Sequence, residues 1–262
     1  MCTIVIAKNI FANKPMVVAA NRDELLDRPS TLPVCHYGIL APKDVVRGGS
    51  WIGVNSHGVI AGLTNRLNVK SVKGRTSRGE LVQEALLWWT AEEAYQELKK
   101  LSGSSYNGFY MFVADAKSLF YLGGTGKEIE AQQEDDGVLA VSNHGVGRQI
   151  TKETPKRVIN ALEAWKQLTP GDASPQELSK VLNVHDSGRY GTCINEPENN
   201  YGTKSSSIIH LSTENPGPDW ENGPKWDYWH RERSGTQHIC QDSFTHQAMK
   251  IQEYGPRKGE IS

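Results

Sequence analysis

The sequence predicts one α+β domain built on antiparallel sheets. The first observation is that strand-like and helix-like segments come in blocks, in the order strands, helices, strands, helices, strand, which is not the alternation of a parallel sheet. The second is that the strand-like segments are short, rich in β-branched residues and separated by turn residues. The third is that no change in composition marks a linker, so we treat residues 1–262 as a single domain.

Four strands are expected in the first quarter of the chain. Residues 2–7 (CTIVIA) and 15–20 (PMVVAA) are apolar runs rich in β-branched residues, and the turn NIFANK joins them. Residues 45–55 and 58–65 are two further candidates, separated by Ser-His-Gly, which is typical of a tight hairpin.

Two helices are expected next. Residues 77–89 carry apolar side chains at helical spacing, with Ser77 as the expected N-cap and Glu80 in the capping-box position. Thr90 and Glu93 form a second capping box, which predicts a helix that ends near residue 101.

The rest of the chain again predicts strands, then two helices, and then a last strand. The helix expected at 155–168 is followed by a short one whose start is marked by a cap serine, a first-turn proline and a capping-box acid at 174, 175 and 177. After the last expected strand comes a tail rich in Trp, Gly and Pro, whose aromatic residues Trp220, Trp226, Tyr228 and Trp229 are expected to pack in the core. The expected strands are 107–115, 118–124, 137–143 and 204–212.

Composition excludes several functional classes. A net charge of −1 gives no electrostatic footprint for nucleic acid or for an anionic membrane. The apolar runs are far shorter than the roughly 20 residues of a transmembrane helix, and the N-terminus has no basic region or cleavage site typical of a signal peptide. The four cysteines are far apart and form no C-x-x-C, which favours a reducing compartment. We therefore expect a cytoplasmic protein. The cysteines are Cys2, Cys35, Cys193 and Cys240.

The position of Cys2 suggests catalysis. If Met1 is removed, the thiol and the free α-amino group belong to one residue at the start of a strand, which is the arrangement of an N-terminal nucleophile. An ordinary thiol has a pKa of about 8.5, so it needs a base or a positive neighbour. An α-amino group, with a pKa near 8, can accept its proton.

Polar residues follow three of the expected strands. Asn21, Asn65 and Asn143 could donate to an oxyanion, although asparagine after a strand is most often a turn former. Within the tetrapeptide NRDE, Arg22 could hold a thiolate, and a carboxylate of Asp23 or Glu24 could orient the α-ammonium group. A solvated salt-bridge loop is the alternative.

Several stretches together resemble the NRDE family, whose animal member is the transport-and-Golgi-organisation protein. They are MCTIVIA, AANRDE, GGSWIGVNSHGVIAGLTN, RTSRGELV, YNGF, AVSN and YGTKSSSIIHL. The resemblance is strongest over residues 1–212 and implies the N-terminal-nucleophile hydrolase fold, with two stacked antiparallel sheets between helical layers (αββα). Residues 213–262 would pack on this domain or be partly irregular.

A more distant resemblance to bile-salt and penicillin-V acylases implies the catalytic roles. Cys2 would be nucleophile and base, Arg22 and Asp23 its charged support, and Asn65 and Asn143 the binders of the oxyanion and amino group. Asp23 and Glu24 are interchangeable in this alignment. The late arginine of those enzymes corresponds to Lys204, which lacks the bidentate fork of arginine.

Further residues are expected to contact the substrate or line the site. The substrate-binding candidates are Asn21, Glu24, Trp51 and Lys204, with Trp51 packed in the core beside the site. Gly48 and Gly49 are expected to serve a bulge or a close approach of two backbones. The segment RTSRGEL offers Arg75 and Arg78 as contacts for an anionic ligand.

Two functional hypotheses follow from the residues and the resemblance. In the first, a Cys2-dependent hydrolase cleaves a small acyl amide or thioester and needs no cofactor. In the second, a carrier binds haem without chemistry, in line with the family's association with haem trafficking and acyl-CoA metabolism. No histidine stands out as a haem ligand, and the spacing of His238, Cys240 and His246 predicts no metal site. Homo-oligomerisation stays open.

Overall fold

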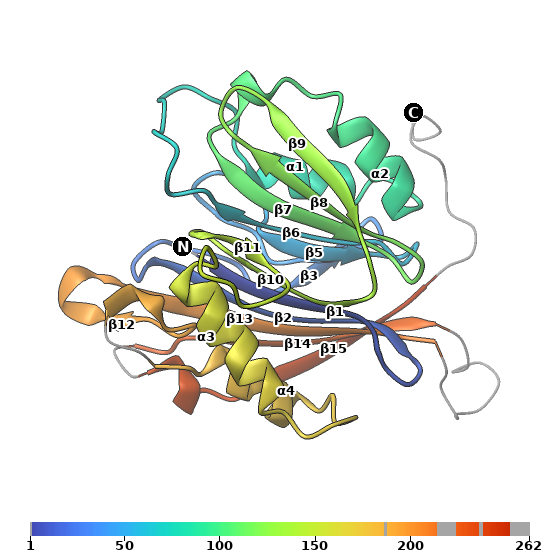
Figure 1. The fold of residues 1–262 in the computed structure, drawn as a ribbon, viewed down its shortest axis with the longest axis vertical. Coiled ribbons are helices and arrows are strands. Elements are labelled where there is room, and N and C mark those ends of the chain that lie inside the picture. Colours follow the sequence, from blue (N-terminus) through green and yellow to red (C-terminus); the bar gives the residue numbers. More distant parts are fainter. Residues whose placement is uncertain (1, 186–187, 214–223, 236–237, 252–262) are drawn as a thin grey trace.

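Two antiparallel sheets lie face to face, and helices cover the outer face of each (Figure 1). The computed structural model describes residues 2–185, 188–213, 224–235 and 238–251. Helices α1 and α2 pack on one sheet, and α3 and α4 pack on the other, while β1 of one sheet contacts β6 of the other. The four-layer αββα arrangement expected from the resemblance is therefore confirmed.

The first sheet contains the N-terminal strand at its centre. Its order is β11-β10-β1-β2-β13-β14-β15, and β12 pairs with β13 at one end. All these pairings are antiparallel. The strands are β1 (Cys2–Phe11), β2 (Lys14–Leu25), β10 (Gly137–Ser142), β11 (Gly145–Gly147), β12 (Asn195–Glu196), β13 (Tyr201–Ser212), β14 (Lys225–Glu232) and β15 (Thr245–Lys250).

The second sheet is a simple meander in chain order. Each strand pairs antiparallel with the next, so the sheet is built from local hairpins. The strands are β3 (Val34–His36), β4 (Ile39–Ala41), β5 (Ile52–Asn55), β6 (Ile60–Asn65), β7 (Phe109–Ala114), β8 (Leu119–Gly124) and β9 (Ile129–Glu134).

The helices follow the capping signals of the sequence, with one exception. The capping box of Thr90 and Glu93 is present, and Ser174 caps α4 as expected. The expected Ser77 cap is wrong: α1 is a short helix whose N-cap is Arg78, without a side-chain cap. The helices are α1 (Gly79–Ala85), α2 (Ala91–Leu98), α3 (Lys156–Lys166) and α4 (Pro175–Leu182), with 3-10 turns at Gly103–Ser105, Gly188–Tyr190, Pro197–Asn199 and Ile239–Gln241. None of them has the length and apolar character needed to cross a bilayer, as far as the described residues extend.

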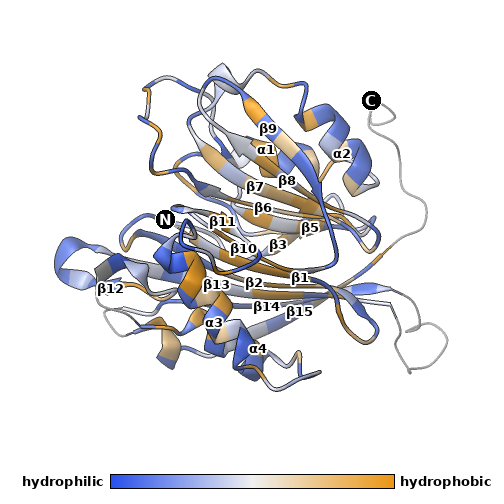
Figure 2. Ribbon diagram, in the orientation of Figure 1, coloured by the Kyte–Doolittle hydropathy of each residue, from blue (hydrophilic) through white to orange (hydrophobic). Residues whose placement is uncertain are grey.

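The central strands are rich in hydrophobic residues (Figure 2), and these residues lie on both faces because both faces are covered. Alternate residues of β1 serve different layers: Ile4 and Ile6 enter the core between the sheets, whereas Val5 and Ala7 face α3 and α4. This explains why residues 2–7 form an unbroken apolar run instead of alternating with polar residues.

The NRDE tetrapeptide lies inside a strand and not beyond its end. The expected strand 15–20 is only the middle of β2, which continues through Leu25 because β13 pairs with it from Met16 to Leu25. A bulge in β13 between Thr203 and Ser205 shifts the register beside Arg22. The polar residues of NRDE are thus fixed by sheet hydrogen bonds.

The expected strand 45–55 is also shorter than predicted, since only Ile52–Asn55 is extended. The preceding loop passes directly over the start of α1. A Cβ atom added at Gly49 would lie 2.6 Å from the carbonyl carbon of Gly79, so the close backbone approach expected for Gly49 is present.

The tail supplies two strands that the sequence did not predict. β14 pairs with β13, and β15 pairs with β14, so the C-terminal region extends the first sheet. Trp226 on β14 is fully buried between the sheets, and its Nε1 donates to the carbonyl oxygen of Asn55 on the second sheet at 3.0 Å. Trp226 therefore joins the two sheets by packing and by a hydrogen bond. Trp220, also expected in the core, lies outside the described residues.

We expect Trp226→Ala to lower the free energy of unfolding by roughly 3–5 kcal/mol, because it removes a fully buried aromatic side chain. Trp226→Phe, which loses the hydrogen bond but keeps most of the apolar surface, should cost about 1–2 kcal/mol. Urea denaturation measures both, with the exposed Leu32→Ala as a near-neutral control. If the Trp226→Ala protein is as stable as the Leu32→Ala control, Trp226 does not join the two sheets as described.

Candidate active site

Cys2 lies in the wall of a cavity of about 240 Å³. The pairing of β1 with β2 places it directly opposite Arg22, so the thiol and the guanidinium share one face of the sheet. Asp23, Glu24, Trp51 and Asn65 also line this cavity. The structure therefore brings together six of the nine residues that the sequence selected.

Arg22 is held firmly although it is almost completely buried. Its Nη2 donates to Oδ2 of Asp44 at 2.8 Å, and its guanidinium carbon lies 4.4 Å from the centre of the Trp51 ring. Its Nη1 is buried and has no hydrogen-bond partner among the described residues. A buried, positively charged N–H group at a cavity wall is available for a negative charge on a ligand or on the Cys2 thiolate.

Asp44 lines the cavity and holds two of its arginines, Arg22 and Arg28, by hydrogen bonds. Its carboxylate accepts hydrogen bonds from Arg28 Nε at 2.7 Å and from the backbone N–H of Arg47 at 2.9 Å, in addition to Arg22. Burial alone would raise the pKa of Asp44, but these hydrogen bonds and the nearby arginines together lower it. Glu24 adds longer ion pairs of 3.9 Å to Arg22 and 3.8 Å to Arg28.

The environment of Cys2 does not favour a spontaneous thiolate. Burial raises the pKa of the thiol, and Asp23 raises it further. Arg22 and a hydrogen bond from the backbone of Asp23 lower it, but burial dominates and the pKa is raised. Arg22 therefore does not by itself offset the effect of burial on the pKa of the thiol, and a base is needed to take its proton. Met1 lies outside the described residues.

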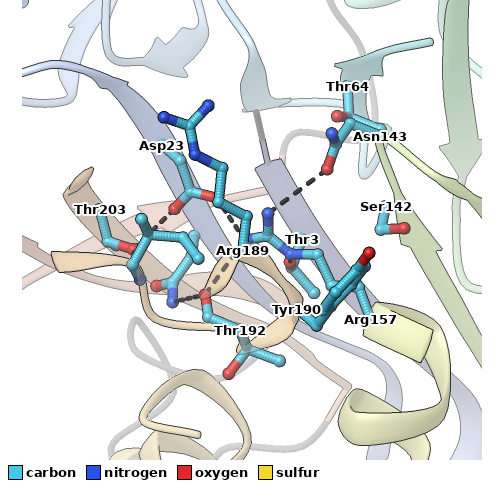
Figure 3. Close-up of polar contacts among 12 residues, drawn as sticks. Thr3, Asp23, Thr64, Ser142, Asn143, Arg157, Arg189, Tyr190, Thr192 and Thr203 are labelled. Carbon is cyan, nitrogen blue, oxygen red and sulfur yellow. Dashed lines mark hydrogen bonds and ion pairs between the residues drawn. The ribbon is translucent and has the colours of Figure 1, made fainter. Parts of the chain in front are cut away.

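On the opposite face of β2, Asp23 forms a fully buried ion pair with Nη2 of Arg157 on α3 (Figure 3). Thr203 donates a hydrogen bond to the other carboxylate oxygen at 2.6 Å. The Nε of Arg157 donates to Oγ1 of Thr3 at 2.6 Å. This pair ties β1, β2, β13 and α3 together directly behind Cys2.

The two asparagines assigned to the oxyanion occupy different positions. Asn65 is the last residue of β6 and lines the cavity. Asn143 follows β10 and is buried, and its Oδ1 accepts a hydrogen bond from Arg157 at 3.4 Å. Its carbonyl oxygen accepts the N–H of Leu67 at 3.0 Å, which holds the segments after β6 and β10 together. Its Nδ2 is buried without a partner among the described residues.

Two of the expected binding residues face away from the cavity. Asn21 donates to the carbonyl oxygens of Leu182 and Thr192, both at 2.8 Å, so it anchors the layer of α3 and α4. Lys204 lies at the bulge of β13, and its Nζ donates to the carbonyl oxygen of Leu26 at 2.8 Å. Neither residue lines the cavity, and neither does Asn143.

The cavity is rich in arginine. Five arginines line it together with the carboxylates of Glu24 and Asp44, whereas the carboxylate of Asp23 is on the opposite face of β2, where it pairs with Arg157. Arg75 donates to the carbonyl oxygen of Tyr106 at 2.7 Å, and Arg78 donates to that of Gly108 at 3.0 Å. Burial lowers the pKa of Arg78, which still remains charged at neutral pH. The lining arginines are Arg22, Arg28, Arg47, Arg75 and Arg78.

Sequence reasoning missed Arg157, Arg28 and Asp44. Arg157 occupies the buried face of α3 together with Val158, Ala161 and Leu162. An arginine in the apolar stripe of a helix requires a buried partner, so this pattern in the sequence indicates a buried ion pair. Asp44 and Arg28 lie in loops, where no periodicity predicts the position of a side chain.

The two stacked sheets, with Cys2 starting a central strand at the cavity wall, have the fold of the N-terminal-nucleophile hydrolases. The Caenorhabditis elegans ortholog of N-acylethanolamine-hydrolyzing acid amidase superposes with a TM-score of 0.58 at 15% identity, covering 79% of this chain and 92% of that chain. The C2A mutant of a conjugated bile acid hydrolase from Clostridium perfringens gives 0.58 at 11% identity, covering 98% and 95%.

The chain belongs to the Transport and Golgi organisation 2 family, whose model matches residues 1–221. The Transport and Golgi organization protein 2 homolog of Homo sapiens is 30% identical, over 78% of this chain and 83% of the relative. The homolog of Bos taurus is 28% identical over the same shares. The family expected from the NRDE motifs is confirmed.

We expect the Asp23–Arg157 pair to behave as a unit. Asp23→Leu or Arg157→Met should each lower the free energy of unfolding by roughly 3–5 kcal/mol, because each leaves a buried charge without its partner. The double variant should lose much less than the sum, since it buries neither charge. Urea denaturation of the four proteins gives the coupling energy. Additive losses would show that the two side chains act independently.

Proposed function

We propose that the protein is a Cys2-dependent hydrolase that cleaves small acyl amides or thioesters carrying an anionic group. The observation that carries the proposal is that Cys2, at the start of β1, lines a cavity opposite the buried guanidinium of Arg22. In this proposal Met1 is removed, so that the thiol and the α-amino group belong to the same residue.

The α-amino group supplies the base that the partly buried thiol requires. It takes the proton from the Cys2 thiol, and the thiolate adds to the carbonyl carbon of the substrate. The tetrahedral intermediate collapses as the ammonium group returns the proton to the departing amine or thiol, which leaves a thioester on Cys2. Water then adds to the thioester, with its proton passing to the amine, and the acid is released with the thiol restored.

Positive and amide N–H groups around Cys2 can stabilise the developing oxyanion. Nη1 of Arg22 and Nδ2 of Asn143 are buried donors without a partner among the described residues, and Asn65 lines the cavity. Donors fixed in advance by the fold lower the barrier because they need no reorganisation during the reaction. We assign the oxyanion to Asn65, which lines the cavity, and the thiolate charge to Arg22, whereas Asn143 lies outside the cavity wall and supports the segment after β6.

The lining favours a small anionic substrate. Trp51 and Leu63 are the large apolar residues of the lining, whereas most of the other lining residues are polar or charged. A cavity of about 240 Å³ is smaller than the usual range for drug-sized ligands, roughly 300–1,000 Å³. A carboxylate or phosphate on the substrate would pair with Arg78 or its neighbours. The two superposed proteins are similar to this chain in fold only. Their names give different substrates, N-acylethanolamines for one and conjugated bile acids for the other, so they do not indicate the substrate of this chain.

The haem-carrier hypothesis makes a different prediction for the same cavity. No histidine is among the described residues of its lining, so Cys2 would have to be the axial ligand. Binding haem would not require a free α-amino group, whereas hydrolysis would. Comparing protein with and without Met1 therefore separates the two hypotheses.

We expect wild-type protein to hydrolyse members of a panel of small acyl amides and acyl thioesters, and Cys2→Ala to be inactive. Arg78→Gln should raise KM for anionic substrates roughly 10- to 100-fold, the loss expected for one charge-assisted hydrogen bond. Its kcat should change far less, because this contact binds the ground state and the transition state equally. Product release is followed by mass spectrometry.

Arg148→Gln is the matched control, since Arg148 pairs with Glu134 away from the cavity. It should leave KM and kcat unchanged. Turnover that survives Cys2→Ala would refute the proposal, and stoichiometric haem binding without turnover on the panel would favour the carrier.

A further inference from the structure

Four potential metal ligands from separate parts of the chain converge away from the cavity. They are His185 after α4, Cys193 before β12, and His238 and Cys240 at the 3-10 turn Ile239–Gln241. One ligand atom from each lies within 4.8 Å of all the others. The spacing along the sequence gave no indication of this cluster, because it forms only when the segment after β14 folds back against the segment after α4.

The separations match the edges of a tetrahedral zinc site. Zn–S bonds of about 2.3 Å and Zn–N bonds of about 2.0–2.1 Å at the tetrahedral angle place two sulfurs roughly 3.8 Å apart and a sulfur and a nitrogen roughly 3.6 Å apart. The Sγ atoms of Cys193 and Cys240 are 3.6 Å apart. Cys193 Sγ lies 3.7 Å from Nδ1 of His238, and Cys240 Sγ lies 3.4 Å from Nε2 of His185.

The ligand chemistry also selects zinc. Two thiolates and two imidazoles in a tetrahedral arrangement are typical of zinc, whereas calcium and magnesium prefer oxygen ligands. The two thiolates would neutralise the charge of the ion, which suits a partly buried position with one buried cysteine and one exposed histidine. Four protein ligands leave no open position, so such a site is structural and not catalytic.

We propose that His185, Cys193, His238 and Cys240 bind one Zn²⁺ ion, which fixes the segment behind the nucleophile strand. The carbonyl oxygen of Thr192, next to Cys193, accepts hydrogen bonds from Asn21 and Arg157. On the other side, the N–H of Ile194 donates to Thr203 Oγ1, and Thr203 donates to Asp23. The ion therefore holds the same short segment that satisfies the buried Asp23–Arg157 pair.

The metal content of tag-free, full-length protein purified without chelator tests the site. We expect one zinc per chain by elemental analysis and by native mass spectrometry. Replacing zinc with Co²⁺ should give the visible d–d bands and the thiolate charge-transfer band of a tetrahedral site. A strong chelator should remove the ion and lower Tm, because the metal binds only the folded chain.

Variants separate this site from adventitious binding. Cys240→Ser and the exposed His185→Ala should lose the zinc, whereas Cys35→Ser, with an exposed cysteine outside the cluster, should keep it. If Cys240→Ser fails to fold, the metal content of wild type and of His185→Ala still decides the question. Protein without zinc would overturn the proposal, either with all thiols free or with a Cys193–Cys240 disulfide that lowers the intact mass by two hydrogens.

Discussion

Asp23 and Arg157 form an ion pair from which solvent is excluded, and the packing of the first sheet around Cys2 depends on it. Burying either charge alone would be strongly unfavourable, so the pair must form for β1, β2, β13 and α3 to pack. Hydrogen bonds from Thr203 to the carboxylate, and from Arg157 to Thr3, Asn143 and the Thr192 carbonyl, satisfy the remaining polar atoms. Two charged residues of NRDE therefore have separate roles. Asp23 joins α3 and β13 to β2 on the side away from the cavity, and Arg22 faces the cavity.

The same packing explains the chemistry of Cys2. A position at the start of a central strand makes the thiol rigid, but burial raises its pKa and suppresses the thiolate. In the proposed hydrolase, a base on the same residue would resolve this conflict, because the α-amino group requires no further positioning. In the proposed hydrolase, the arginines around the cavity would act mainly on the substrate and on the charge that develops during attack. Asp44 holds Arg22 and Arg28 in place by hydrogen bonds.

The fold could be predicted to a large extent from local patterns. The apolar runs, the capping boxes and the family motifs indicated the αββα layers, and the register of β1 with β2 follows from their short connection. What the sequence could not provide were contacts fixed by long-range pairing. β14 and β15 lie in a tail whose sequence shows no clear alternation of polar and apolar residues. Asn21 and Lys204 point away from the cavity because of the pleat of β2 and the bulge of β13. The Cys193–Cys240 contact joins residues that are far apart in the chain.

The most direct test is the intact mass of the native protein before and after mixing with a reactive acyl thioester. Before mixing, the mass should correspond to a chain that lacks Met1 and begins with Cys2. After rapid quenching, one acyl group should be added, peptide mapping should place it on Cys2, and Cys2→Ala protein should remain unmodified. A chain that retains Met1, or an acyl group that is found equally on Cys35 and in Cys2→Ala protein, would contradict the account.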